Sequence, residues 1–364
     1  MKNILFITAS IGFGGAAKML CFVANSLSQR GYNVTIANIK NTTNTSSFSQ
    51  QLDEKVKVVD ASVTTGKKGL RRFEQINSVT KIAKEHKADI VIGFTSMPNF
   101  IAKMVSLRLH IPSIISERGD PFITWSKSLA DKVLLYFINR SAGAVFQTDG
   151  AGKFYSKGLQ KRGRVIPNPI FIKGDVPDVE YKDREKTVVS VGRLDMYQKR
   201  YDIMLGAFKL FSEKHPEYTL KLYGDGSSID EIKGIINELE LNDKVEFMGL
   251  TTKPMQDTAK DGMFLITSDF EGISNSLLEA MAAGLPSVST DHSPGGARLL
   301  ITSGENGLLA PVGDAKGLAD AMCRFAENPD LAEKCGNNAK DVINRFAPEK
   351  IIDMWEDYIK SFRR

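Results

Sequence analysis

Two glutamates eight positions apart, Glu271 and Glu279, carry the strongest chemical signal in the sequence. The first lies in a short turn rich in glycine and serine, and the second lies in a segment of helical spacing, SLLEAMAAG. We expect Asn275 or Ser276 to cap this helix and Gly284 to end it, before a strand with the sequence LPSVST. The free N–H groups of a helix start favour an anionic ligand such as a phosphate. Phosphate binding beside carboxylates that can accept bonds from hydroxyl groups predicts a nucleotide-sugar pocket.

The length and composition are typical of a soluble protein with more than one domain. The chain has 364 residues, of which 42% are hydrophobic and 25% are charged, so two domains are expected. Its three cysteines, Cys21, Cys323 and Cys335, are odd in number and lack metal-ligand spacing. They indicate a reducing compartment and no disulfide framework. We find neither a signal peptide nor an apolar run of membrane-spanning length, and therefore expect a cytoplasmic protein.

The charge is distributed unevenly along the chain. Residues 1–175 contain 25 Lys and Arg against 11 Asp and Glu, whereas the remaining residues contain 23 against 32. A basic first half suggests contact with an anionic surface or substrate. No nucleic-acid-binding module is present, so we expect no nucleic acid partner. An anionic membrane surface that carries a lipid-phosphate acceptor becomes the better candidate once the family resemblance given below is considered.

One basic segment has the composition of a membrane-surface helix. Residues 66–86 show amphipathic helical spacing, and the first of them interleave basic with apolar side chains. The candidate contacts are Lys67, Lys68, Arg71 and Arg72. A solvated charged face is the alternative explanation.

Strand and helix patterns alternate throughout the chain. A strand at 2–8, a glycine loop and a helix at 16–30 open the first βαβ unit. Residues 173–186 are charged, contain a proline and lack periodicity, which indicates a linker. We therefore predict an α/β protein with two doubly wound Rossmann-like domains. The predicted boundaries are 1–172 for the first domain, 173–186 for the linker, 187–345 for the second domain and 346–364 for a C-terminal helix.

The segment EGISNSLLEAMAAGLP resembles the signature of retaining family-4 (group 1) glycosyltransferases of the GT-B fold. Similar matches occur at RVIPNPI (164–170), at GRLDMYQKRYDIMLGAF (192–208) and at DHSPGGARLLITSGENGLLAP (291–311), so the resemblance covers nearly the whole chain. It implies that the two domains face each other across a cleft and that the C-terminal helix crosses back to the first domain.

The resemblance also implies roles for individual residues. Arg193 and Lys199 would clamp the donor diphosphate, Glu279 would hold the ribose, and Glu271 would contact the transferred sugar or stabilise positive charge at its anomeric carbon. The expected catalytic residues are therefore Glu271, Arg193 and Lys199. The expected donor-binding residues are Gly14, Gly15, Arg193, Lys199, Gly272, Ile273, Ser274, Asn275 and Glu279. Because cations and a helix N-terminus neutralise the leaving group, we expect neither a metal nor another cofactor.

The sequence departs from the family pattern at three positions. Ala17 stands where a glutamate is usual, and Arg200 stands where a glycine is usual. In SERGDP (116–121), Arg118 occupies the position at which other members often carry a histidine of the cleft. Because this segment follows a strand, Glu117 and Arg118 are candidates for acceptor contact; an ion pair between them is the alternative.

The implied function is transfer of a hexose or N-acetylhexosamine from a nucleotide-diphosphate sugar, foremost a UDP-sugar. The implied acceptor is a glycan or a lipid-linked saccharide in surface polysaccharide synthesis, such as capsule or lipopolysaccharide. The enzyme would be cytoplasmic or peripheral on the cytoplasmic face of the membrane. Two alternatives are a nucleotide-sugar 2-epimerase and a catalytically degenerate partner subunit. A dinucleotide oxidoreductase is disfavoured because GFGGAA lacks the G-x-G-x-x-G spacing.

Overall fold

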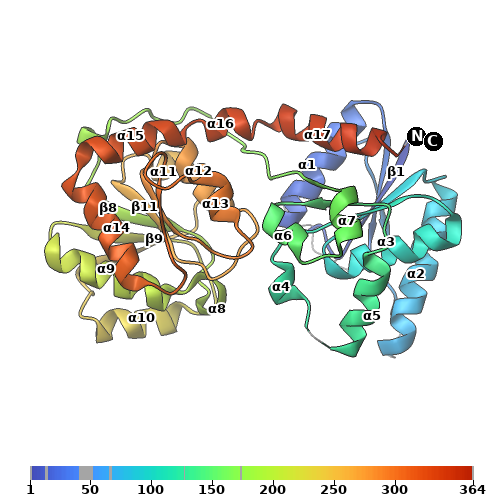
Figure 1. Ribbon diagram of the computed structural model, residues 1–364, viewed down its shortest axis with the longest axis horizontal. Coiled ribbons are helices and arrows are strands. Elements are labelled where there is room, and N and C mark those ends of the chain that lie inside the picture. Colours follow the sequence, from blue (N-terminus) through green and yellow to red (C-terminus); the bar gives the residue numbers. More distant parts are fainter. Residues whose placement is uncertain are drawn as a thin grey trace. The chain divides into compact units, whose positions relative to one another are not determined.

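The computed structural model divides the chain into two compact units (Figure 1). The structure describes residues 2–12, 15–40, 52–64, 68–126, 128–172 and 174–362. The first unit contains residues 1–169 and 349–364, and the second contains residues 170–348. Residues 174–186 of the expected linker therefore belong to the second unit, as an irregular stretch with one short 3-10 turn, η2 (Tyr181–Asp183), ahead of its first strand.

Seven parallel strands form the sheet of the first unit, in the order β3-β2-β1-β4-β5-β6-β7. They are β1 (Asn3–Thr8), β2 (Asn33–Asn38), β3 (Lys57–Asp60), β4 (Ile90–Phe94), β5 (Ser113–Ser116), β6 (Gly143–Phe146) and β7 (Gly163–Val165). The order reverses direction at β1, because β2 and β3 extend to one side of it and β4 to β7 to the other. This is the doubly wound arrangement that the strand–helix alternation predicts.

The helices of the first unit cover both faces of this sheet. They are α1 (Gly15–Gln29), α2 (Lys68–Glu85), α3 (Ser96–Leu109), α4 (Pro121–Thr124), α5 (Leu129–Ile138), α6 (Asp149–Lys153), α7 (Lys157–Arg162) and α17 (Pro348–Lys360). Successive side chains of a strand point to opposite faces. Ile4 and Phe6 thus pack with α1 and α17, whereas Leu5 and Ile7 pack with α2 and α3. Because helices cover both faces of the sheet, these strands are apolar at successive positions and do not alternate between apolar and polar residues.

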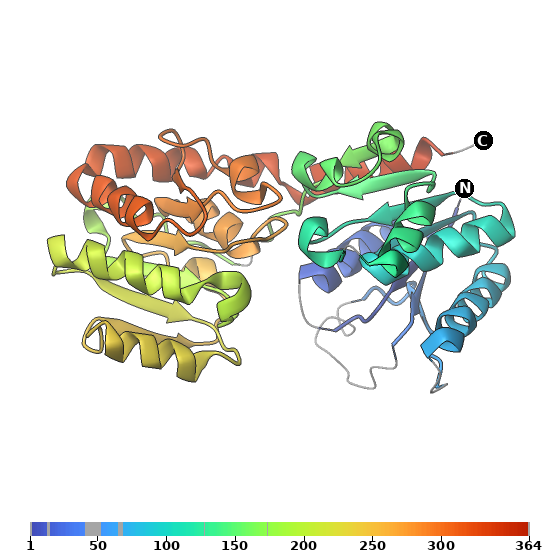
Figure 2. The same cartoon turned by 60° about the horizontal axis from the view of Figure 1, so that its bottom comes forward.

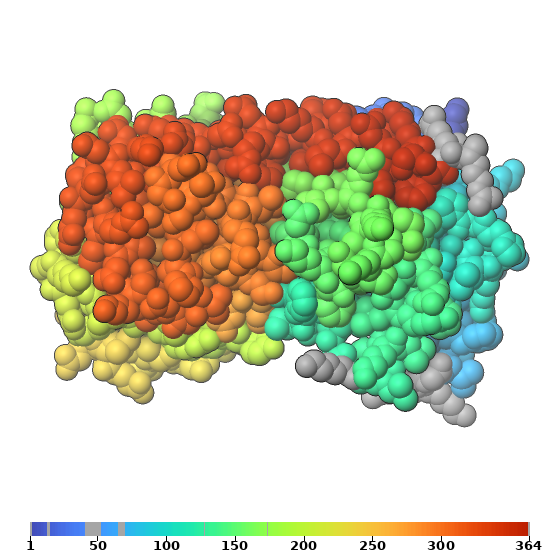
Figure 3. All heavy atoms as spheres, in the orientation of Figure 1, coloured from blue at the N-terminus to red at the C-terminus, as the bar shows by residue number. Residues whose placement is uncertain are grey.

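The C-terminal helix α17 is an integral part of the first unit. Its apolar face is buried in the same core as α1, through the side chains of Ile351, Ile352, Trp355, Tyr358 and Ile359. The Tyr358 hydroxyl accepts a hydrogen bond from the Ala144 N–H at 2.8 Å, which fixes α17 beside β6 (Figure 2). Arg30 at the end of α1 pairs with Asp353 and Glu356, each at 2.7 Å. In Figure 3 the surface of α17, in red, lies against the green side chains of the first unit.

Six parallel strands form the sheet of the second unit, in the order β10-β9-β8-β11-β12-β13. They are β8 (Thr187–Val191), β9 (Thr219–Tyr223), β10 (Val245–Gly249), β11 (Met263–Ile266), β12 (Ser287–Thr290) and β13 (Leu308–Ala310). Here the order reverses at β8, next to β11. In open parallel sheets, ligands bind outside the carboxyl ends of the strands at such a reversal. We therefore expect a ligand to bind at the segments that follow β8 and β11.

Helices again cover both faces of the sheet. They are α8 (Met196–Lys199), α9 (Tyr201–Lys214), α10 (Ile229–Glu238), α11 (Pro254–Asp257), α12 (Asn275–Ala282), α13 (Gly296–Leu300), α14 (Ala315–Glu327), α15 (Pro329–Ala339) and α16 (Val342–Arg345). One core joins Val188 of β8 to α9, α10 and α14, and the other joins Val189 to α12 and α13. Within the described ranges, no helix combines the length and apolar character needed to cross a membrane.

Candidate active site

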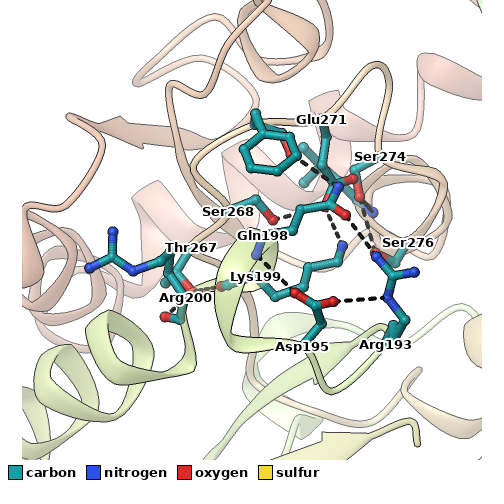
Figure 4. Close-up of polar contacts among 12 residues, drawn as sticks. Arg193, Asp195, Gln198, Lys199, Arg200, Thr267, Ser268, Glu271, Ser274 and Ser276 are labelled. Carbon is teal, nitrogen blue, oxygen red and sulfur yellow. Dashed lines mark hydrogen bonds and ion pairs between the residues drawn. The ribbon is translucent and has the colours of Figure 1, made fainter. Parts of the chain in front are cut away.

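The predicted catalytic residues of the second unit converge beside the carboxyl ends of β8 and β11 (Figure 4). Arg193 follows β8 directly, and Lys199 is the last residue of the short helix α8. Glu271 lies in the turn between β11 and α12. Two segments about 70 residues apart therefore supply one site, and the sheet reversal at β8 and β11 is what joins them.

Lys199 and Glu271 form the centre of this site. The Lys199 ammonium donates a hydrogen bond to Glu271 Oε1, and the Ser268 hydroxyl donates to the same oxygen at 2.8 Å. Only 14% of the Lys199 side chain and 10% of the Glu271 side chain are exposed. The Glu271 backbone N–H donates to the Ser293 carbonyl at 2.8 Å, which anchors the turn. The carboxylate is thus held in one place, with a fixed positive charge beside it.

The environment of Glu271 keeps its carboxylate ionised. Burial by itself raises the pKa of Glu271, but the charge of Lys199 and the hydrogen bonds from Lys199 and Ser268 outweigh it. The resulting pKa lies below the ordinary value of a glutamate. Glu271 therefore enters a reaction near neutral pH as an anion and as a hydrogen-bond acceptor.

Arg193 is held at the edge of the site with its guanidinium open to solvent. Its side chain is 62% exposed, and its Nε lies 3.6 Å from Asp195. Its Nη2 donates to Gln198 Oε1 at 2.9 Å, while Gln198 Nε2 donates to the Phe270 carbonyl at 3.0 Å. Gln198 thereby links Arg193 to the Glu271 turn. An anion at this position would find an oriented cation without the cost of burying it first.

Helix α12 starts one residue earlier than expected. Ser274, and neither Asn275 nor Ser276, is the N-cap: its hydroxyl accepts a hydrogen bond from the Leu277 N–H at 3.4 Å. The three residues are all good capping types, and the extended backbone of Ser274 decides between them. Gly284 ends the helix as expected, in the left-handed region at φ 70°, with a bond from its N–H to the Met281 carbonyl.

Two glycines let the Glu271 turn pack against the start of α13. A Cβ placed on Gly296 would lie 1.7 Å from the Gly272 carbonyl oxygen, which is far inside van der Waals contact. This close approach explains the requirement for glycine at Gly296 in DHSPGG, a position whose role the sequence alone leaves open. The turn that holds Glu271 is therefore shaped by backbone contact with a second loop.

Replacing Gly296 with alanine should displace the Glu271 turn and weaken ligand binding there. We expect a loss of about 1–3 kcal/mol in the free energy of unfolding, as for other overpacked sites. Urea denaturation and titration with nucleoside diphosphates measure the two effects. Gly234→Ala in α10 is the matched control, because nothing lies within 4 Å of a Cβ there. If Gly296→Ala behaves like Gly234→Ala in both assays, the contact does not shape the site.

Arg200, which stands where the family pattern has a glycine, has a left-handed backbone. Its φ of 52° and ψ of 57° lie in the left-handed region, where glycine is the residue without strain. The side chain offsets this cost with ion pairs to Asp202 and Asp269, at 2.7 and 2.8 Å. The Thr267 hydroxyl also donates to the Lys199 carbonyl at 2.8 Å. Arg200 thus fixes the end of α8, and with it Lys199.

The remaining donor-binding candidates occupy two different units. Gly272 and Ile273 are buried in the turn, and Asn275 and Glu279 are half-buried on α12. Gly15 is the exposed first residue of α1, in the first unit. Gly14 lies outside the described residues. The structure places the second-unit candidates in the turn between β11 and α12 and on α12 itself.

His292 is a neighbour of this site whose burial the sequence does not reveal. We expected it to be a neutral residue in a loop. It does lie in the loop after β12, yet its side chain is fully buried, and burial lowers its pKa although Glu271 opposes the shift. A neutral imidazole thus packs behind the Glu271 turn. A single histidine in a polar loop carries no periodic signal from which this could be predicted.

In the first unit, Glu117 and Arg118 face different partners. Glu117 is 2% exposed and accepts hydrogen bonds from the Tyr155 hydroxyl at 2.5 Å and from the N–H of Arg118 at 3.1 Å. The Arg118 guanidinium instead donates to Ser116 Oγ at 2.8 Å and lies 5.4 Å from the Trp355 ring centroid. The two side chains are thus not joined by a direct ion pair in the described structure. Burial raises the pKa of Glu117 and lowers that of Arg118 to about 9.

The basic candidates on α2 are only partly described. Arg71 and Arg72 are exposed, next to the exposed apolar side chains of Leu70 and Phe73. Lys67 and the side chain of Lys68 lie outside the described residues.

One group of potential metal ligands forms far from these residues in the sequence. A ring nitrogen of His215, the Cys323 sulfur and a Glu327 oxygen lie within 4.8 Å of one another. His215 follows α9, whereas Cys323 and Glu327 are one turn apart on α14. The sequence contains no acidic or histidine cluster with metal-ligand spacing, and we therefore expected no metal. The three side chains meet only in the folded chain. None of the predicted catalytic residues belongs to this group.

Two family models together match most of the chain. Residues 13–172 match the model described as Glycosyltransferase Family 4, and residues 175–342 match the model described as Glycosyl transferases group 1. An uncharacterised glycosyltransferase of Haemophilus influenzae is 25% identical over 361 residues, which cover 98% of this chain and 99% of the relative. An α-1,4-N-acetyl-D-galactosaminyltransferase of Campylobacter jejuni, whose name gives a PP-undecaprenol-linked saccharide as acceptor, is also 25% identical, covering 98% and 97%.

Solved structures confirm the predicted fold class. The Anabaena protein HepE, determined in complex with UDP and glucose, superposes with a TM-score of 0.82 and 21% identity over 99% of this chain and all of that one. The apo form of the lipopolysaccharide outer core galactosyltransferase WaaB gives a TM-score of 0.79 at 22% identity over 99% of each chain. This chain therefore has the GT-B fold.

Proposed function

Because this chain belongs to the glycosyltransferases of group 1 and family 4, we propose that it transfers a sugar from a UDP-sugar, with retention of anomeric configuration and without a metal ion. The observation that carries this proposal is the convergence of Lys199, Glu271 and Arg193 at the sheet reversal of the second unit. The UDP-bound state of the related HepE structure supports the choice of uridine.

The site has the charges that departure of a diphosphate requires. As the glycosidic bond of the donor breaks, negative charge grows on the leaving oxygen. Lys199 and Arg193 supply positive charge there, and the N-terminus of α12 adds the positive end of its dipole. Cations supplied by the protein in this way replace the divalent ion that other transferases use. Metal independence is part of the proposal for this reason.

Glu271 is positioned for the sugar and not for the diphosphate. As an anion held by Lys199, it can accept hydrogen bonds from sugar hydroxyls and stabilise positive character at the anomeric carbon. We assign Glu279, half-buried on α12, to the ribose hydroxyls. The acceptor would attack from the face that the diphosphate leaves, so that the configuration is retained.

We propose a glycan or a lipid-linked saccharide as acceptor, in a pathway that builds surface polysaccharide. The names of several relatives support this: one acts on an undecaprenol-linked saccharide and another is a poly(ribitol-phosphate) α-N-acetylglucosaminyltransferase. The acceptor would bind the first unit. Because Glu117 and Arg118 are buried and engaged, we assign them to holding the ends of β5 and β6 in place for that acceptor.

Transfer should continue in excess EDTA and should give the α product from an α-linked donor. The test combines UDP-sugars with a synthetic polyprenyl-diphosphate saccharide and reads the anomeric coupling of the product by NMR. Equal rates with EDTA and with added magnesium support metal independence. A β product, or activity that EDTA abolishes and magnesium restores, would contradict this part of the proposal.

We further propose that the first unit contacts an anionic membrane through the starts of α2 and α5. Exposed apolar side chains gather on these elements and on α4: Leu70, Phe73, Phe122, Ile123, Leu129, Val133 and Tyr136. The pKa of Asp131, at the start of α5, is lowered chiefly by the hydrogen bond from the Ser126 hydroxyl, and the charge of Arg72 on α2 makes the smallest contribution. Arg71 and Arg72 supply charge for acidic lipid, and the apolar side chains can enter the headgroup region.

Removing both arginines, in an Arg71→Ala, Arg72→Ala variant, should weaken binding to phosphatidylglycerol vesicles roughly 30-fold, at about 1 kcal/mol for each basic residue. Lys81→Ala, Lys84→Ala on the same helix is the matched control, because these side chains start about 15 Å further along, beyond the Debye length of about 10 Å. Vesicle sedimentation at two salt concentrations measures both. Vesicle binding that does not depend on the salt concentration, or that is weakened equally in both variants, would contradict the proposed membrane contact.

A further inference from the structure

A large hollow in the first unit lies at the edge of the sheet opposite to the strand ends that carry the acceptor-side residues. Its volume is about 930 Å³, in the range of pockets that hold small molecules. The lining comes from the residues just before β4, β5 and β6, from the second half of α3 and from the end of α17. Strands begin at this edge, so the hollow belongs to neither the donor site nor the acceptor side.

Lys103 is the unusual residue of this hollow. It lines the hollow from α3, and 9% of the residue is exposed. Among the residues that the structure describes, no hydrogen bond or ion pair reaches its ammonium group. The charges that act on it are those of Arg162 and Arg140, and together with burial, the larger cause, they lower the pKa of Lys103. A largely buried lysine near two other cations is costly unless an anion offsets its charge.

The two arginines have structural partners that account for them. Arg140 Nη1 donates to the Tyr136 carbonyl at 2.8 Å, and Arg162 Nη2 donates to the Asn139 carbonyl at 3.1 Å. Both carbonyls lie at the end of α5, where the negative end of the helix dipole favours cations. No such explanation applies to Lys103, which lies in the interior of α3.

The one carboxylate in the described lining is already engaged. Asp89 accepts hydrogen bonds from the backbone N–H groups of Lys2 at 2.6 Å and Asn3 at 2.9 Å. Burial by itself raises the pKa of Asp89, but these two bonds outweigh it and hold the pKa below its ordinary value. Asp89 thus stabilises the start of β1 and forms no ion pair with Lys103 in the described structure.

We propose that this hollow binds a soluble phosphate-bearing small molecule, with its phosphate on Lys103 and Arg140. Lysine and arginine are the side chains that bind phosphate most strongly. Leu107 and Phe362, which also line the hollow, offer apolar contact to the remainder of the ligand. Because the hollow is built from the first unit alone and contains none of the candidate donor-site residues, the ligand would modulate the enzyme rather than react.

Thermal denaturation in phosphate, pyrophosphate and sodium chloride at equal ionic strength tests this site. For the native chain, Tm should rise with phosphate and pyrophosphate concentration and not with chloride. In an Arg193→Ala background, which weakens phosphate binding at the proposed donor site, Lys103→Met should weaken the phosphate response at least about tenfold, since it removes a charged hydrogen-bond donor. Lys157→Met, at an exposed position on α7, should leave the response unchanged. A native chain that responds alike to all three salts, or a Lys103→Met variant that responds like its Arg193→Ala parent, would overturn the proposal.

Two additional measurements separate the alternatives. Arg140→Met should also weaken the phosphate response, and it covers the case in which Lys103→Met does not fold. Sedimentation with phosphatidylglycerol vesicles distinguishes a soluble phosphate from a lipid headgroup. A phosphate response lost in Lys103→Met with vesicle binding intact identifies a soluble ligand, and loss of both identifies a lipid phosphate at the same site. In an otherwise native background, uridine diphosphate should bind the second unit equally well in all of these variants. A failure of the phosphate-site proposal can therefore be distinguished from a failure of the proposed sugar transfer.

Discussion

Replacing either Lys199 or Arg193 with alanine should lower the rate of sugar transfer by at least about 100-fold. Each side chain places positive charge where the departing diphosphate gains negative charge, in a site from which water is partly excluded. Removal of one such donor typically costs a factor of 100 to 1,000 in kcat. Because the interaction strengthens as the bond breaks, kcat should fall more than KM rises.

The two variants should differ in stability. Lys199 is 14% exposed and bonded to Glu271, so Lys199→Ala leaves a buried carboxylate without its cation. The Arg193 side chain is 62% exposed, so the Arg193→Ala variant should unfold at the same urea concentration as the native chain. Steady-state kinetics and urea denaturation on both variants separate catalysis from folding. Lys334→Ala, at an exposed position on α15, is the control for loss of a cation. Near-normal transfer in both Lys199→Ala and Arg193→Ala would remove the diphosphate clamp from the mechanism.

The Glu271→Gln substitution should reduce transfer by a similar factor while preserving the shape of the side chain. The neutral amide cannot stabilise positive charge at the anomeric carbon, and it leaves the Lys199 ammonium without an anion. We also expect a loss on the order of 3 kcal/mol in unfolding free energy, the scale for breaking a mostly buried pair. Glu238→Gln on the exposed face of α10 serves as the control.

The pH dependence of stability provides a second readout for Glu271. Its pKa in the folded protein lies below the unfolded value of about 4.3. The carboxylate therefore stabilises the native chain at neutral pH, and this contribution is lost as the pH falls through the folded pKa. The stability difference between the native chain and Glu271→Gln should accordingly be largest near pH 7 and shrink in acid. A difference that is constant from pH 7 to pH 3 would show that the Glu271 charge does not stabilise the fold.

Local sequence patterns were sufficient for much of the fold. Apolar runs such as ILFI in β1 and the spacing of SLLEAMA in α12 predict elements that the structure contains, since both faces of each sheet are buried and each helix has one apolar stripe. The candidate catalytic residues could be predicted only from family motifs, because an exposed arginine and a lysine after a strand have no distinctive pattern by themselves. The structure then shows which of them touch.

Features that depend on distant contacts could not be predicted. The choice of Ser274 as the cap depends on its backbone angles, which the packing of the Glu271 turn sets. The left-handed conformation of Arg200 depends on Asp269, which lies about 70 positions later in the chain. The His215, Cys323 and Glu327 group forms because α9 and α14 pack together. In each case a tertiary contact, and not periodicity, determines the outcome.

Different observations argue against the two alternatives to an active transferase. The comparisons give no support to a nucleotide-sugar 2-epimerase, because the relatives are named as transferases of several kinds. A degenerate partner subunit would be expected to lose the contacts around the donor. Lys199, Glu271 and Arg193 are all present, and the first two are directly bonded. Binding of a donor at this site would therefore distinguish an active transferase from a degenerate partner subunit.

The most direct test is a thermal-shift and hydrolysis screen of the purified chain against UDP-, GDP-, ADP- and dTDP-sugars, each beside its free nucleoside diphosphate. A ligand that binds only the native state raises Tm by mass action, by about 2.7 kcal/mol in stability at 100 times its Kd. We predict that UDP-sugars and UDP raise Tm, that one UDP-sugar slowly releases UDP, and that Lys199→Ala abolishes both effects. No shift with any of the four nucleotides, or an equal shift in Lys199→Ala, would contradict the assignment of this site to the donor.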